Sequence, residues 1–119
     1  MFLNISNHPS SAWSAKQLEA AKQYGEIADL AFPNVPPSAS KEEVQALAES
    51  VLSQAMQMNP DCVMCSGEYT LTYALVNGFK AENIKTVAAC TERKTEERTD
   101  ENGRTVRTSI IEFVCFREF

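Results

Sequence analysis

The segment from Asn4 to Ser10 concentrates side chains that can hydrogen-bond a ligand. Its amide, hydroxyl and imidazole groups belong to Asn4, Ser6, Asn7, His8 and Ser10. His8 is the only histidine of the chain, and imidazole is the side chain that most often acts as a general base near neutral pH. The same residue types favour turns, so the alternative is a loop that only leads into the next helix.

A second polar segment, Ser66–Thr70, reads SGEYT and follows an apolar strand pattern. Its candidate ligand-binding residues are Ser66, Gly67, Glu68, Tyr69 and Thr70. Gly67 permits a close backbone approach, and the free amides at a helix start suit a phosphate. Glu68 would repel an anion if it pointed inward, and the segment lacks both the dinucleotide fingerprint and the lysine of a phosphate-binding loop. The alternative is a helix start that is simply well capped by Glu68 or Thr70.

Two basic residues, Arg93 and Lys94, follow the expected fourth strand, where they could reach a phosphate held by the two loops. They belong to a charged region that also contains Arg98, Arg104 and Arg107 among several acidic residues. Balanced charges on paired strands normally form a solvated ladder of cross-strand pairs, which is the alternative role for both residues.

The composition excludes several classes of function. A chain of 119 residues is expected to form one domain over 1–119, and its net charge of −5 argues against binding to duplex DNA. No apolar run is long enough for a membrane span and no signal peptide is evident, so we expect a soluble, cytoplasmic protein. Cys62 and Cys65 should lie on opposite faces of a strand, so we expect no metal site. We also expect no cofactor.

Apolar periodicity alternates between strand-like and helix-like segments. Strands are expected at Phe2–Ser6, Ile27–Phe32, Cys62–Ser66 and Lys85–Cys90, with helices after Ser14, after Ser40 and after the SGEYT segment. The residues from Thr91 onward read as a long hairpin with its turn at Asp100–Gly103. This order predicts an α/β, Rossmann-like three-layer sandwich, with a mostly parallel sheet and an antiparallel C-terminal β-hairpin.

The two polar loops are expected to meet at one edge of this sheet. A flavodoxin-like strand order of 2-1-3-4-5 places the first and third strands side by side, at the point where the crossover direction reverses. Ligands of open α/β sheets bind beyond the carboxyl ends of the strands at that point. The loops that end there begin at Ser6 and at Ser66.

With these residues in view, the chain resembles the small stand-alone CRISPR-associated Rossmann-fold (CARF-like) proteins. The resemblance lies in the loop NISNHPS after the first strand, SGEYTLT after the third, and TERK after the fourth. It implies a homodimer that binds a cyclic oligoadenylate second messenger, cyclic tetra-adenylate first, in type III CRISPR antiviral signalling. It also implies that the protein either sequesters the ring or cleaves it as a metal-independent ring nuclease.

Carried onto this sequence, the resemblance places Asn4, Ser6, Asn7 and His8 near the ribose or the phosphates, with Ser66, Gly67 and Thr70 beneath them. The candidate catalytic residues are His8, Asn7 and Arg93, and Lys94 is a second cationic helper. Cleavage would rest on holding a ribose 2′-OH in line with its phosphate. The rivals are a non-catalytic interaction module and a small nucleotide or sugar-phosphate enzyme that uses His8 as its base. Trp13 either stacks on a base or packs the first helix onto the sheet.

Overall fold

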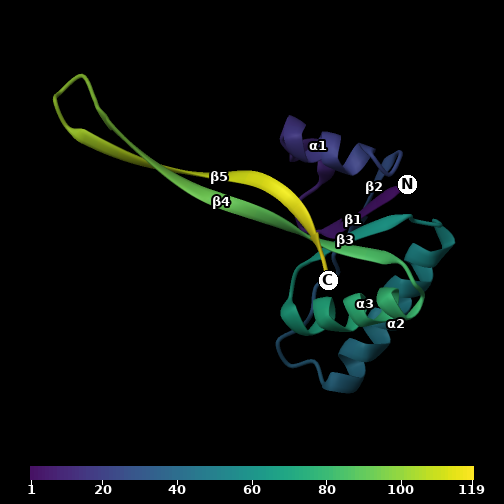
Figure 1. Cartoon of the computed structure of the whole chain (residues 1–119). Helices are drawn as coiled ribbons and strands as arrows, with labels where there is room; N and C mark the ends of the chain where they lie inside the picture. Colours follow the sequence, from purple (N-terminus) through teal and green to yellow (C-terminus); the bar gives the residue numbers. More distant parts are fainter.

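The computed structural model describes residues 1–119 as five strands and three helices (Figure 1). The strands are β1 (Phe2–Ser6), β2 (Ile27–Ala31), β3 (Cys62–Ser66), β4 (Lys85–Thr99) and β5 (Thr105–Glu118). The helices are α1 (Ala15–Lys22), α2 (Lys41–Gln57) and α3 (Tyr69–Ala81), and a 3₁₀ turn at Ser10–Ala12 precedes α1. None of the three helices combines the length and apolar character that crossing a membrane requires.

The sheet has the strand order β2-β1-β3-β4-β5. β1 pairs in parallel with both β2 and β3, β3 pairs in parallel with β4, and β4 pairs antiparallel with β5. This confirms the Rossmann-like α/β fold and the expected order. Because β1 and β3 are neighbours, Ser6 and Ser66 lie opposite one another at the carboxyl edge of the sheet.

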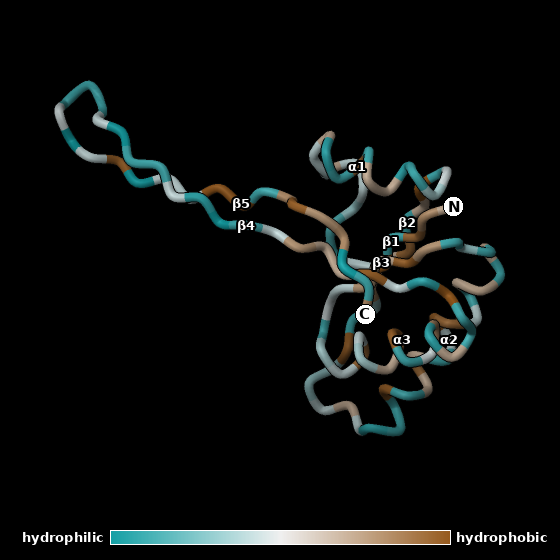
Figure 2. The backbone as a smooth tube through the Cα atoms, in the orientation of Figure 1, coloured by the Kyte–Doolittle hydropathy of each residue, from teal (hydrophilic) through white to brown (hydrophobic).

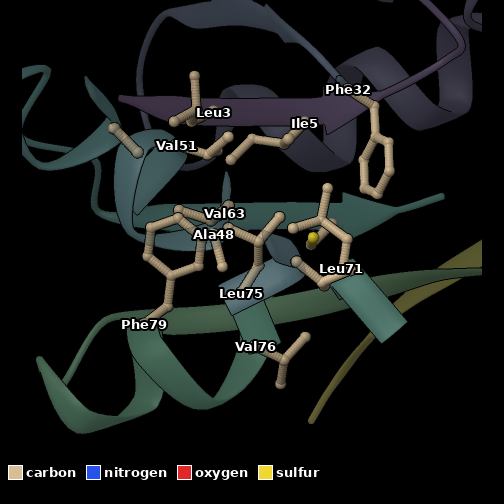
Figure 3. Close-up of a cluster of buried hydrophobic side chains, with 13 residues drawn as sticks. Leu3, Ile5, Phe32, Ala48, Val51, Val63, Leu71, Leu75, Val76 and Phe79 are labelled. Carbon is tan, nitrogen blue, oxygen red and sulfur yellow. The ribbon is translucent and has the colours of Figure 1, made fainter. Parts of the chain in front are cut away.

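The helices cover the sheet from both faces, with α1 on one side and α2 and α3 on the other (Figure 1). The larger core cluster lies under α2 and α3, where alternate residues of the strands meet the apolar stripes of both helices (Figure 3). Its fully buried members include Leu3, Ile5, Val63, Leu71, Leu75 and Phe79. Burial of each large side chain of this kind stabilises the fold by roughly 1.5–3 kcal/mol.

A smaller cluster lies on the other face, beneath α1. Phe2 is its centre, and its ring packs against Trp13, Tyr24 and Phe116 with centroid separations of 6.0, 5.9 and 5.0 Å. Trp13 also lies 6.3 Å from Phe116. The indole therefore fastens the start of α1 to the sheet, which is one of the two roles expected from the sequence.

Serine caps begin the first two helices, as the sequence indicates. The Ser40 hydroxyl accepts a hydrogen bond from the Glu43 N–H at 3.1 Å, and the Ser40 N–H donates to the Glu43 carboxylate at 3.4 Å. This is a complete capping box. At α1 only half of that arrangement forms, because the Ser14 hydroxyl accepts from the Gln17 N–H without a return bond from the Gln17 side chain.

The fourth strand is much longer than the sequence suggests. Lys85–Cys90 was expected to end before a separate hairpin, but β4 continues to Thr99 and forms one side of that hairpin itself. A register shift between Cys90 and Thr91 marks the place where the paired strands leave the sheet. Beyond it they project from the body of the molecule as a two-stranded arm (Figure 1), which we define as residues 92–112.

The arm turns where the sequence predicts. The Asp100 N–H donates to the Arg104 C=O at 2.8 Å, and the Asp100 carboxylate accepts from the N–H groups of Asn102 and Arg104. Gly103 has φ of +76°, a conformation that residues with a Cβ rarely adopt.

The Cys-x-x-Cys pair divides between the two faces of β3. Cys65 belongs to the core under α2 and α3, and Cys62 to the cluster under α1, as strand alternation predicts. No group of three or more His, Cys, Asp or Glu side chains is arranged to hold a metal ion. Burial raises the pKa of the Cys62 thiol to about 11 and that of Cys65 to about 12, from an ordinary 9.0.

These raised thiol pKa values predict an alkaline weakness of the fold. Because the unfolded thiols ionise near pH 9 and the folded ones do so only near pH 11–12, the stabilisation is fully present below pH 9 and is lost as the pH rises above it. Urea titrations at several pH values across this range should show that loss.

In the native protein at neutral pH, Ellman's reagent should label the exposed Cys115 and leave Cys62 and Cys65 unlabelled until urea is added. Rapid native labelling of Cys65 would contradict this.

Candidate functional site

A cleft of about 840 Å³ opens at the carboxyl edge of the sheet, on the face that α1 covers. Ser6 and His8 reach it from the loop after β1, Ser66 from the end of β3, and Lys16 and Gln17 from the first turn of α1. The base of the hairpin closes the far side. The structure therefore brings the first polar loop and Ser66, the first residue of the second, to one cleft at the sheet edge that the strand order predicts.

The cleft is lined by both apolar and polar side chains. Met64, Trp13, Ala89, Ile111 and Phe113 supply the apolar surface. The polar lining includes hydroxyl groups from Ser14, Ser66 and Thr91, one carboxylate from Glu112, and the side chains of His8 and Lys16. Such a combination suits a flat, partly apolar molecule with hydrogen-bonding groups along its edge.

Asn4 and Ser6 hold the shape of the first loop from below. Asn4 is only 1% exposed, and its amide N–H₂ donates to the His8 C=O at 2.8 Å and to the Asp29 carboxylate at 2.9 Å. The Ser6 hydroxyl donates to the Asn4 Oδ1 at 2.7 Å and accepts from the His8 N–H at 3.1 Å. Asn4 is therefore a positioning residue whose polar groups are already used by the loop.

Ser10 belongs to the same network. Its N–H and hydroxyl donate to the two carboxylate oxygens of Asp29, at 3.1 and 2.9 Å. Asp29 comes from β2 and lies opposite Asn4 in the parallel register, so it ties both ends of the loop to the sheet. The backbone of His8 is fixed by these hydrogen bonds, and the exposed residue lines the cleft. Asn7 is exposed beside it and lies outside the residues that line the cleft.

The second loop is organised around Glu68, the N-cap of α3. Its carboxylate accepts from the N–H groups of Thr70 and Leu71, at 3.0 and 2.9 Å, and from the Thr70 hydroxyl at 2.7 Å. These hydrogen bonds, with that of the Thr70 hydroxyl the strongest, lower the pKa of Glu68. The Glu68 carboxylate therefore occupies the N–H groups of Thr70 and Leu71, which a phosphate at this helix start would otherwise bind.

Tyr69 and Thr70 point away from the sheet-end cleft. They line a separate groove of about 990 Å³ between α2 and α3, where Tyr69 is 89% exposed and Tyr73 is 73% exposed. Of the SGEYT segment, only Ser66 lines the cleft that the first loop forms.

Gly67 is required by packing and not by an unusual backbone angle. A Cβ at this position would lie 2.5 Å from the ring of Phe32, a residue of the larger core that is 8% exposed. We expect Gly67→Ala to lower the free energy of unfolding by about 1–3 kcal/mol, because the buried ring has little room to move. Urea denaturation checks this. In a Phe32→Leu background the same change should cost less, and an equal cost in both backgrounds would contradict the explanation.

Arg93 and Lys94 do not line the cleft. Both lie on the arm because β4 continues through them. The Lys94 ammonium pairs with the Glu112 carboxylate at 3.0 Å, and this hydrogen bond raises the pKa of Lys94. Arg107 forms a second cross-strand pair with Glu97 at 2.7 Å. Lys94 and Arg107 therefore match the cross-strand ladder that was the alternative interpretation, whereas Arg93 forms no ion pair.

Sequence reasoning missed Lys16 and Gln17, which line the cleft from α1. One signal was available, because a helix that follows a strand through a short loop begins at the carboxyl edge of the sheet. Its first turn must then lie beside the switch point. Asp29 carried no comparable signal, since its role depends on the register between β1 and β2.

Comparison with curated proteins finds no match. Among solved structures, a Staphylococcus aureus structure described as an MnaA–UDP co-structure is similar, with 16% sequence identity and a TM-score of 0.47. The similarity covers 74% of this chain and 28% of that one, so the chain spans little more than a quarter of the length of that protein. A family model matches residues 1–117, almost the whole chain. The chain belongs to the family that this model describes, the uncharacterized protein MJ1673 family.

Proposed function

We propose that the protein binds an adenylate ligand in the sheet-end cleft, with a cyclic oligoadenylate as the first candidate. The observation that carries this proposal is the meeting of Ser6, His8 and Ser66 at one cleft that is lined by both apolar and polar side chains. An adenine ring has two apolar faces and a hydrogen-bonding edge, so it matches such a cleft better than a compact, fully polar metabolite does.

The basic groups that line the cleft determine where a phosphate would lie. Lys16 and His8 line the cleft, whereas Arg93 and Lys94 are on the arm. In this proposal Lys16 takes the cationic role that the sequence suggested for Arg93 and Lys94. Ser66 and Ser14 can donate to ribose or phosphate oxygens. Glu68 keeps the amides at the start of α3 occupied, so affinity must come from the base, the ribose and Lys16.

A ring of adenylates is larger than one cleft, so the proposal includes a homodimer in which two clefts share one ring. It places the protein in the cytoplasm, where such a messenger would be made and consumed. Binding without cleavage is the simpler form, in which the protein sequesters the messenger. Cleavage would require His8 or Asn7 to act on a ribose 2′-OH held in line with its phosphate.

Calorimetry and thermal-shift measurements with cyclic tetra-adenylate, cyclic hexa-adenylate, linear oligoadenylate and ATP test the proposal. A ligand at 100 times its Kd should stabilise the native state by about 2.7 kcal/mol and raise the Tm by on the order of 10 °C. Lys16→Ala should weaken binding at least tenfold. Lys22→Ala is the matched control, because Lys22 lies on the same helix but outside the cleft. Equal affinities for the two variants, or no shift with any adenylate, would refute the proposal.

Chromatography of the products separates binding from cleavage. If His8 is a general base, His8→Ala should abolish turnover while calorimetric affinity changes by less than about threefold, since the loop backbone is held by Asn4 and Ser6. Intact ring after long incubation with the wild-type protein would leave sequestration as the function. Turnover that is unchanged in His8→Ala would remove His8 from the mechanism.

A further inference from the structure

We infer that the outer edge of β5 pairs with the same edge of a second copy of this chain, joining two arms across a two-fold axis. This inference concerns the arm and stands independently of the ligand.

Most of the arm extends away from the body of the molecule, and only Ile111 and Glu112 of its residues line the sheet-end cleft (Figure 1). Apart from the half-exposed Asp100 and Val106, every residue of the arm is exposed. The radius of gyration of the chain is 17.4 Å, against about 13–14 Å for a compact domain of this length. An isolated two-stranded ribbon is marginally stable at best in water, so an arm of this length calls for a further strand or surface to pack against.

The apolar side chains of the hairpin lie on β5, on both faces of the ribbon, whereas the β4 half of the arm has none. From Thr108 to Phe116 the sequence reads TSIIEFVCF, with Glu112 as its one charged residue. Ile110, Ile111 and Val114 are 39%, 63% and 43% exposed. The apolar stretch is visible along β5 near the root of the arm (Figure 2). Natural proteins protect free edges with charges, prolines or short strands, and this edge has almost no such protection.

The hydrogen-bonding groups of this edge are also free. Hydrogen-bonded and non-hydrogen-bonded residue pairs alternate along the two strands. Asp100 and Arg104 at the turn form a hydrogen-bonded pair. The register is unbroken from the pair Thr99–Thr105 to the pair Thr91–Phe113. By this alternation Ser109 and its partner Thr95 form a non-hydrogen-bonded pair. Their N–H groups therefore point outward, that of Ser109 from the β5 edge and that of Thr95 from the β4 edge.

A second copy of the chain fits this edge for two reasons. The arm has five basic and six acidic residues between Glu92 and Glu112, so two arms approach without strong repulsion, whereas a nucleic acid would find no basic surface. Two-fold pairing of identical edges satisfies both edges at once and leaves neither free, which closes the assembly at a dimer.

Proline substitution tests the edge directly. Proline lacks an N–H and is tolerated in an edge strand where that N–H points to solvent. Ser109→Pro removes an outward N–H from β5, and Thr95→Pro removes the matching one from β4 at the same level of the arm. Neither residue lines the cleft.

Sedimentation velocity and light scattering without ligand should show the wild-type protein at twice the 13.2 kDa chain mass. Thr95→Pro should remain dimeric, and Ser109→Pro should run as a monomer with an unchanged circular dichroism spectrum outside the arm. Hydrogen exchange should show protection of the Ser109 amide in the wild-type dimer. A monomeric wild type, a dimer that survives Ser109→Pro, dissociation by both prolines, or a fast-exchanging Ser109 amide would each overturn the inference.

Discussion

Replacement of Phe2 by Ala should lower the free energy of unfolding by about 3–5 kcal/mol, a large share of the stability of a small domain. Phe2 is fully buried at the centre of the cluster under α1, with three aromatic rings around it. It lies on β1, which is bonded to β2 on one side and β3 on the other. The backbone therefore cannot move inward to refill the space, and the cavity term adds to the lost burial.

Urea denaturation followed by the fluorescence of Trp13, the only tryptophan, measures this loss at the affected cluster. Phe119→Ala is the matched control, because that ring is 47% exposed at the end of the chain, and it should cost less than about 1 kcal/mol. Phe2→Ala should also weaken ligand binding, since α1 carries Lys16 into the cleft and Trp13 holds the start of α1 to Phe2. Equal losses of stability in the two variants would contradict the role assigned to this cluster.

Asn4→Ala is expected to cost about 2–4 kcal/mol, although it removes no apolar surface. The change leaves the Ser6 hydroxyl, the His8 C=O and one Asp29 oxygen without the partner that Asn4 provides. Each lost hydrogen bond costs about 0.5–1.5 kcal/mol, and more where it ends on the charged Asp29, although the Ser6 hydroxyl, the His8 C=O and that Asp29 oxygen each keep one other hydrogen bond. Thermal unfolding of Asn4→Ala beside Asn7→Ala provides the comparison, since Asn7 is exposed and should change stability by less than about 0.5 kcal/mol.

Asn4→Asp tests the same network because it changes the charge of the side chain but hardly changes its shape. The introduced carboxyl would place an oxygen where the amide now donates to the Asp29 carboxylate at 2.9 Å. Burial and the neighbouring charge should raise its folded pKa above the unfolded value of about 3.9. The variant should therefore be closest to wild type below pH 4 and lose stability as the pH rises through the folded pKa. A stability difference that does not vary with pH would show that Asn4 is not bonded as described.

The order of elements could be predicted from the sequence because each one carries a local signal. The Ser40 capping box, the apolar run Cys62–Ser66 and the turn residues at Asp100–Gly103 are all readable without tertiary contacts. From that order followed the position of the two loops at one sheet edge. The cleft that contains Ser6, His8 and Ser66 was in this sense predictable.

The remaining features depend on contacts that a single sequence does not contain. The fourth strand was expected to end at Cys90, where its apolar residues end. The charged segment TERKTEERT contains no strand breaker, so β4 continues through it into the arm. Arg93 and Lys94 were placed at the cleft for that reason. The partnership of Asn4 with Asp29 depends on the register of β1 against β2, and the choice of Glu68 between capping and repelling an anion depends on one side-chain torsion.

The Glu68 cap has a consequence for selectivity. The Glu68 carboxylate competes with any phosphate for the first N–H groups of α3. Because it belongs to the same chain, its effective concentration at these groups exceeds that of inorganic phosphate or a sugar phosphate in solution. The hydrogen bonds from the Thr70 side chain and the two amides lower the pKa of Glu68, which favours the ionised form that caps the helix. The first turn of α3 therefore offers fewer free N–H groups to a small phosphate than an uncapped helix start would.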